Sequence, residues 1–292
     1  MAKKVSKQQT FVAAKMMESF IESGQYSHLM QTKKKIKLLT EAMKQRLESS
    51  EVKRHEFEKY QLVGRFIAKK VYETDIIKLN EYLFDLGLLL PVIEIDNKKI
   101  QENILYWDMI KDFQLEDTFY LKPNFNKVGK ALNNISRNFE VTERWSLEDM
   151  ARTLSLLKPQ AKTYSNNYEK LKRQISKLDE IERIKRLPKE ERFPIPHKYG
   201  SLSVLANQAR YDVSAIYDYI GEWMLIEYGV PNHNLLEHYI LNGTITKREL
   251  EQFKVLKDIR LDFSVMTLED ERKLYELLDS KNRIIAANRM GA

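Results

Sequence analysis

SLEDMARTLSLLKPQAKTY, residues 146–164, is the stretch on which our interpretation of the fold depends. Ser146 can cap a helix, because its side-chain oxygen can accept a backbone N–H three residues on, where Asp149 can reach back. Pro159 suits the first position of a following helix, so the four residues before it are expected to form a turn. A short capped helix, a turn and a second helix predict a helix-turn-helix-like unit over 146–167.

The second helix is expected to continue as one long helix over about 159–187. Its apolar residues recur at spacings of three and four, which is the pattern of a coiled-coil seam. Such a seam requires a partner, either another helix of this chain or the same helix of a second copy. We assign the seam to oligomerisation, and its residues are Tyr164, Tyr168, Leu171, Ile175 and Leu178.

Polar side chains of the same segment are of the types that contact nucleic acid. Lysine, arginine, asparagine and glutamine donate hydrogen bonds to phosphates and to base edges in the major groove. The alternative is a scaffold helix with an ordinary solvated face. The candidate DNA-binding residues are Lys158, Gln160, Lys162, Asn166, Asn167, Lys170 and Arg173. A second, weaker helix-turn-helix pattern spans 205–220, where Asp212 can cap its second helix.

Elsewhere the chain has few Gly and Pro residues and long stretches of helical periodicity, so a mainly α protein built of multi-helix bundles is expected. Helices are predicted near 11–21, 36–47, 57–71, 75–86, 202–228, 247–255 and 268–278. A small β-hairpin near 92–100, turning at Asp96-Asn97, and a strand near 118–123 are the exceptions. The expected domains are 1–90 (helical bundle), 91–187 (mixed), 188–200 (proline-rich linker) and 201–292 (helical).

Charge is distributed unevenly along the 292 residues, whose formal net charge is +7. Residues 1–54 carry 12 Lys and Arg against 5 Asp and Glu, and residues 122–190 carry 16 against 9. Such blocks attract anionic partners, although two solvated helical faces would look the same. The high usage of Lys, Asn and Ile is typical of an AT-rich bacterial or phage genome.

Several classes of protein are disfavoured. The chain has no cysteine, which excludes disulfides and thiolate metal sites and fits a reducing compartment. No apolar stretch is long enough for a transmembrane helix, so we expect a cytoplasmic protein. HExxH, P-loop, GxGxxG and GxSxG motifs are absent. We therefore expect no catalytic residues, no cofactor and no metal.

Together these patterns favour a double-stranded-DNA-binding protein of the regulatory or replication/partition type, forming a homo-oligomer or binding a protein partner. The alternative is a non-enzymatic interaction protein, such as an assembly factor or an inhibitor of another protein. A metal-dependent nuclease is the third class, because carboxylates cluster after the expected hairpin. The clustered carboxylates are Glu102, Asp108, Asp112, Glu116 and Asp117.

Overall fold

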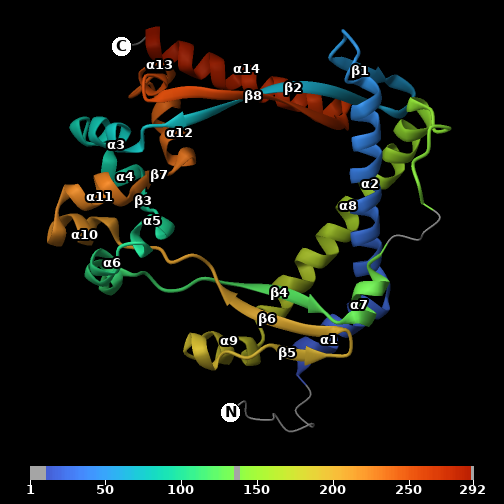
Figure 1. Cartoon of the computed structure of the whole chain (residues 1–292), viewed down its shortest axis with the longest axis horizontal. Coiled ribbons are helices and arrows are strands. Elements are labelled where there is room, and N and C mark those ends of the chain that lie inside the picture. The colour runs from blue at the N-terminus through green and yellow to red at the C-terminus, as the bar shows by residue number, and fades with distance from the viewer. Residues whose placement is uncertain (1–10, 135–138, 291–292) are drawn as a thin grey trace. The chain divides into compact units, whose positions relative to one another are not determined.

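The computed structural model describes residues 11–134 and 139–290, and Figure 1 shows the order of its helices and strands. Within the described chain, helices account for 59% and strands for 20%, and eight strands form three antiparallel sheets. The expectation of a mainly α protein is therefore wrong, because the fold mixes α and β structure. Lys3, Lys4 and Lys7 of the first basic block lie outside the described residues.

The chain divides into two compact units, each made of segments that are distant in sequence. Unit 1 comprises residues 1–65, 118–207 and 263–265, and unit 2 comprises residues 66–117, 208–262 and 266–292. The units therefore differ from the sequential domains that the sequence suggested. The chain passes between the units within strands and loops, not through a proline-rich linker.

Two long antiparallel helices, α2 and α8, form the helical layer of unit 1. Gln25 at the start of α2 contacts Asn167 late in α8, whereas Leu39 and Met43 pack in one cluster with Leu154 of the first half of α8. These three apolar side chains are completely buried. The helices of unit 1 are α1 (Val12–Glu22), α2 (Gln25–Leu47), α7 (Lys127–Leu132), α8 (Leu147–Ile175) and α9 (Asp179–Lys185).

A three-stranded antiparallel sheet completes the core of unit 1. Its strands are β4 (Phe119–Phe125), β5 (Ile195–His197) and β6 (Gly200–Ala206), in the order β4-β6-β5. Ile195 and Leu202 are buried against α1 and the end of α8. The expected linker 188–200 is thus part of a folded unit: it forms η3 (Lys189–Glu191) and β5. The predicted strand near 118–123 is confirmed.

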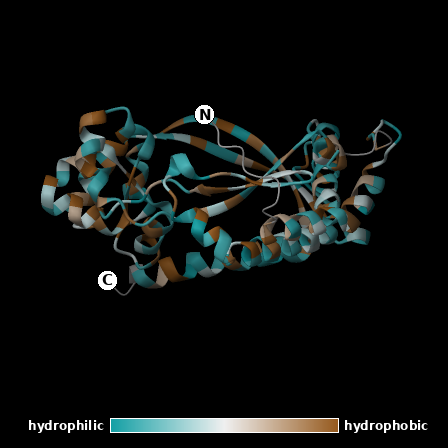
Figure 2. Ribbon diagram, turned by 90° about the horizontal axis from the view of Figure 1, so that it is seen from below, coloured by the Kyte–Doolittle hydropathy of each residue, from teal (hydrophilic) through white to brown (hydrophobic). Residues whose placement is uncertain are grey.

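The sheet β1-β2-β8 corrects two helix predictions. It consists of β1 (Arg54–Phe57), β2 (Leu62–Thr74) and β8 (Lys254–Thr267), with η1 (Glu58–Tyr60) between the first two. The helix expected over 57–71 is absent, because Phe57 ends β1, η1 follows, and 62–71 belong to β2. The helix expected over 247–255 ends at Glu251 as α13, because Lys254 and Val255 begin β8. In β8, polar and apolar residues alternate over 258–265, and Figure 2 shows both kinds along the long strands. Alternation fits a strand with one covered face, and the spacing of apolar residues alone did not distinguish it from a helix.

Unit 2 consists mostly of short helices around one apolar cluster. Asp75 and Asp212 cap two of these helices, as their sequences predicted, by accepting the backbone N–H of Lys78 and Ala215. The helices are α3 (Ile76–Asp85), α4 (Leu89–Val92), α5 (Asn97–Gln101), α6 (Ile104–Ile110), η2 (Lys111–Phe113), α10 (Val213–Ile220), α11 (Glu222–Tyr228), α12 (His233–Leu241), α13 (Lys247–Glu251) and α14 (Leu268–Met290).

The hairpin expected near 92–100 is also wrong. Its first arm is β3 (Ile93–Ile95), but this strand pairs with β7 (Gly229–Pro231), which lies far along the chain. Asp96 does not begin a turn to a second strand. Its carboxylate caps α5 instead, accepting the backbone N–H of Lys98 at 2.9 Å. The same Asx chemistry serves turns and helix starts, so the sequence pattern did not distinguish them.

Candidate nucleic-acid interface

The start of α8 has the cap that the sequence predicted. The Ser146 hydroxyl oxygen accepts the backbone N–H of Asp149 at 3.0 Å, and the Asp149 carboxylate accepts the backbone N–H of Ser146 at 3.2 Å. Hydrogen bonds from Ser146 lower the pKa of Asp149, which keeps this carboxylate charged at the positive end of the helix dipole. The cap defines where the helix begins and in which direction it runs.

The turn expected between Ser155 and Lys158 does not exist. α8 is a single helix of 29 residues that continues through Pro159. Proline within a helix costs roughly 3 kcal/mol, so a favourable term must exceed it. That term is burial along α2, because Leu154 before the proline and Leu171 after it both lie in the core of unit 1. The helix-turn-helix-like unit over 146–167 is therefore corrected to part of one continuous helix.

The second pattern, over 205–220, fails for a similar reason. Its first part, Leu205 and Ala206, belongs to strand β6, and the chain then runs without helix to the Asp212 cap of α10. Only one of the two expected helices exists there. This segment is not a helix-turn-helix unit.

The apolar seam of α8 packs inside its own unit. Tyr164 stacks on His28 of α2 with ring centroids 5.6 Å apart, and Tyr168 meets Tyr26 edge-on at 5.1 Å. Burial raises the pKa of the Tyr168 hydroxyl. Leu171 and Ile175 continue the seam against α1 and the sheet β4-β6-β5, and Leu178 follows after the end of α8. The five residues assigned to oligomerisation therefore find their partner within the chain. The long helix expected over about 159–187 is wrong, because α8 ends at Ile175 and a separate helix, α9, begins at Asp179.

Two of the seven candidate DNA-binding residues are engaged in contacts within unit 1. The Lys158 ammonium donates to the backbone carbonyl of Val265 at 2.5 Å, and its side chain is half-buried. Asn167 donates through Nδ2 to Gln25 Oε1 at 2.9 Å. These contacts hold α8 on β8 and α2. Lys158 serves the packing of unit 1, and Asn167 remains exposed at the junction of the two helices.

Four of the other five residues form what we call the basic face of α8: Lys162, Asn166, Lys170 and Arg173. At about 100° per residue these side chains fall within an arc of about 80°, whereas Gln160 is exposed but lies about 160° away from Lys162. All four are exposed, and none of their side chains forms a hydrogen bond or an ion pair with any described residue. Glu169 borders the arc, but Lys172 pairs with it at 2.6 Å.

The lysines of α2 at 33–37 also fall into two groups, those with contacts inside unit 1 and those without. Lys34 donates to the Asn133 carbonyl at 3.3 Å, and the Lys35 ammonium lies 5.0 Å from the centre of the Phe139 ring. Lys33 and Lys37 are exposed and have no partner among the described residues. The run 33–37 therefore contributes two cations to packing and leaves two in solvent.

The two units carry opposite charge. Unit 1 contains 32 Lys and Arg against 17 Asp and Glu, a formal charge of +15, and unit 2 contains 17 against 25, a charge of −8. The net charge of the chain conceals this difference. Unit boundaries are not visible in the sequence, so the separation emerges only when distant segments are grouped by the fold.

The acidic cluster of unit 2 is spread over α6, η2 and the following loop. Asp108 pairs with Lys111 at 3.1 Å, and Asp117 accepts from the Gln114 amide at 2.9 Å. Over residues 11–134 and 139–290, no three His, Asp or Glu side chains gather closely enough to hold a metal ion. None of the helices described there has an apolar stretch that could cross a bilayer.

Sequence reasoning missed an apolar surface on unit 2. Leu105 on α6 and Tyr219 on α10 are 75% and 78% exposed, and Trp223 on α11 packs edge-on against Tyr106 at 5.2 Å. The signal was present, because α6 (ILYWDMI) is apolar at six of its seven positions and too short to bury them all.

Comparison of the chain with protein-family models, curated proteins and solved structures found no match.

Proposed function

We propose that this protein binds double-stranded DNA through unit 1, with the basic face of α8 contacting the phosphate backbone. The observation that carries the proposal is the excess of positive charge in unit 1, together with a helix face whose cations have no partner among the residues that the structure describes. Cations that a protein does not neutralise internally are available to replace the counterions of DNA.

The contact differs from that of a helix-turn-helix. Lys162 and Arg173 are 11 residues apart, about 16 Å along the helix at about 1.5 Å per residue. Three cations and an amide along that length suit a row of phosphates. Phosphate contacts position a protein but do not read sequence. Binding is therefore expected to depend strongly on salt and weakly on DNA sequence.

The test compares two variants of equal charge. Variant one changes Lys162, Lys170 and Arg173 to glutamine. The control changes Lys69, Lys70 and Arg283 of unit 2, whose side chains are also exposed and have no partner in the described part of the chain. Fluorescence anisotropy with a labelled 30-base-pair duplex gives the affinity between 50 and 200 mM salt. If each cation meets one phosphate, the slope of log K against log salt falls in magnitude by about 2.7, about 0.9 per contact.

The outcomes separate the alternatives. The α8 variant is expected to lose most of its affinity, while the unit 2 control binds like the native chain. Absence of binding by the native chain at 50 mM salt contradicts the proposal. Equal losses in both variants would mean that total charge, not the basic face of α8, drives association. Circular dichroism of each variant verifies that the helices are retained.

A second candidate function is protein binding through the apolar surface of unit 2. Exposed apolar patches of several hundred Å² commonly mark interaction sites. Asp108, Asp218 and Glu222 lie on α6, α10 and α11, the helices that carry the exposed Leu105, Tyr219 and Trp223. A partner with a basic amphipathic helix is therefore complementary in both charge and hydrophobicity.

This candidate is tested with a synthetic amphipathic helix made of leucine and lysine. Titration is followed by tryptophan emission, because Trp223 is part of the surface and is expected to shift to the blue on burial. Serine at Leu105 and Tyr219 should abolish binding, whereas serine at Val255 and Ile259, which are also exposed and apolar, should not. Equal binding by both variants contradicts a specific surface.

A further inference from the structure

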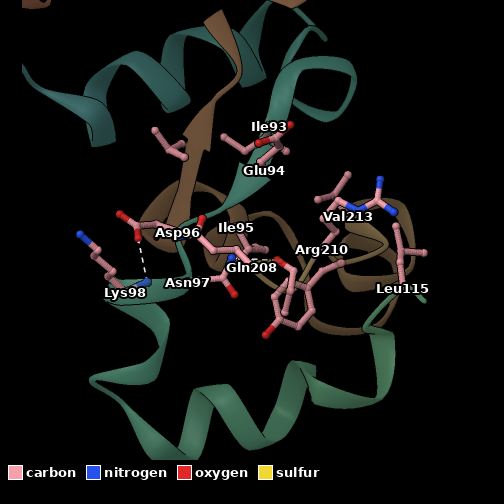
Figure 3. Close-up of a pocket in the computed structure, with 13 residues that line it drawn as sticks. Ile93, Glu94, Ile95, Asp96, Asn97, Lys98, Leu115, Gln208, Arg210 and Val213 are labelled. Carbon is pink, nitrogen blue, oxygen red and sulfur yellow. Dashed lines mark hydrogen bonds between the residues drawn. The ribbon is translucent and has the colours of Figure 1, made fainter. Parts of the chain in front are cut away.

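A pocket of about 520 Å³ lies within unit 2 (Figure 3). One wall is β3 with the start of α5, and the other is the segment 208–213, joined by Val230 of β7. Pockets of this size hold small organic ligands. Because every lining residue belongs to unit 2, the pocket does not depend on any contact between units.

Backbone contacts hold the second wall in place. The Arg210 carbonyl accepts the backbone N–H of Leu115 at 2.8 Å, and the Asp212 N–H donates to the Phe113 carbonyl at 2.9 Å. The Asn97 amide spans the pocket base by donating to the Ala209 carbonyl at 2.8 Å. These bonds use main chain or the amide nitrogen, so they leave the charged side chains of the lining free for a ligand.

The charged side chains of the lining balance: two are carboxylates and two are cations. The side chains of Arg210 and Lys98 have no hydrogen-bond or ion-pair partner among the described residues. Asp96 is occupied as the cap of α5, and Glu94 accepts the Asn232 amide through one oxygen at 2.6 Å. Figure 3 shows the Arg210 side chain on the opposite side of the pocket from Asp96 and Lys98, with Glu94 above them.

Two polar atoms of the lining residues are buried without a partner. They are Oδ1 of Asn97 and the hydroxyl of Tyr211, whose side chain is 7% exposed. A buried polar atom that forms no hydrogen bond costs free energy, so these two atoms do not stabilise the wall. The remaining surface is aliphatic and comes from Ile93, Ile95, Leu115, Val213 and Val230.

We propose that this pocket binds a short zwitterionic peptide. The carboxylate of the peptide meets the Arg210 guanidinium, which can donate hydrogen bonds to both of its oxygens at once. Its ammonium meets Glu94 on the other side. Apolar side chains of the peptide cover the aliphatic wall. A ligand with charge of one sign only would leave one end of the pocket without a counter-charge.

The experiment is calorimetric titration of the full chain with the dipeptide Leu-Leu and two capped forms. Acetylation removes the ammonium of the dipeptide, and amidation removes its carboxylate. We expect the free dipeptide to bind at least tenfold more tightly than either capped form. No binding of Leu-Leu at millimolar concentration, or equal binding of all three forms, overturns the proposal.

Two variants assign the ends of the ligand. Arg210→Gln should weaken binding of Leu-Leu tenfold or more and leave the amide form unaffected, because that form has no carboxylate to lose. Glu94→Gln should weaken binding of Leu-Leu tenfold or more and leave the acetylated form unaffected, because that form has no ammonium. Glutamine at this position can still accept the hydrogen bond from the Asn232 amide. Arg248→Gln, an exposed cation of α13 outside the pocket, is the matched control. If Arg210→Gln and Arg248→Gln bind Leu-Leu equally, the assignment is wrong.

Discussion

Replacing Pro159 with alanine tests whether α8 is continuous. In a continuous helix, proline at this position deprives the Ser155 carbonyl of its backbone donor, and alanine restores that hydrogen bond. Alanine is favoured over proline inside a helix by about 3 kcal/mol. Without proline the unfolded chain has more conformational entropy, which reduces this stabilisation by about 0.4–1 kcal/mol. Pro159 is exposed, so no packing is lost, and a net stabilisation of about 2 kcal/mol is expected.

The assay is urea unfolding followed by circular dichroism, with the midpoint of the transition as the measure of stability. A turn before Pro159 would reverse the sign, because proline at the first position of a helix is favourable and its loss costs stability. Pro188→Ala is the control, because Pro188 precedes η3 and lies outside any long helix. This variant should lower the free energy of unfolding by about 0.4–1 kcal/mol. A Pro159→Ala variant that is no more stable than the native chain would refute a continuous α8.

Three further outcomes are expected. Leu154→Ala, at a completely buried position between α8 and α2, should cost about 2–5 kcal/mol of unfolding free energy, whereas Leu156→Ala, at a position 64% exposed, should cost less than about 0.5 kcal/mol in the same urea assay. Gly200→Ala should lower the melting temperature of unit 1 strongly, because Gly200 has φ of +149° and a Cβ there would collide with the Asn124 carbonyl. Burial lowers the pKa of His197, so the unfolded chain binds more protons than the folded chain. The contribution of His197 to stability is complete above the ordinary histidine pKa of about 6.5 and falls as the pH drops toward the lowered value. His197→Gln should reduce this loss of stability when unfolding is compared at pH 7.5 and 5.5.

Helix starts were the most predictable part of the fold. Ser146, Asp75 and Asp212 cap helices where their sequences indicated, and Thr267 accepts the backbone N–H of Asp270 at the start of α14. A cap is a hydrogen bond between residues two or three positions apart, so the information for it is local. Asp96 shows the limit, because the same local bond caps a helix that we had interpreted as a hairpin turn.

The candidate interface was only partly predictable. Lys162, Asn166, Lys170 and Arg173 share one exposed face because helical spacing alone places them there. That Lys158 and Asn167 are used for packing depends on β8 and α2, whose residues are more than a hundred positions away. The neighbours of a side chain decide whether its donor is satisfied, and spacing within one helix does not name those neighbours.

The sequence by itself determined the positions of the caps, the amphipathic character of α8 and the two blocks of positive charge. Tertiary structure decided that residues 57–71 are strands, that α8 passes through Pro159 and that its tyrosine seam is internal. The physical reason is the distance along the chain over which each free energy acts. Caps and helical spacing depend on residues within one or two turns, whereas strand pairing and burial depend on partners such as β8 and α2, which only folding brings into contact.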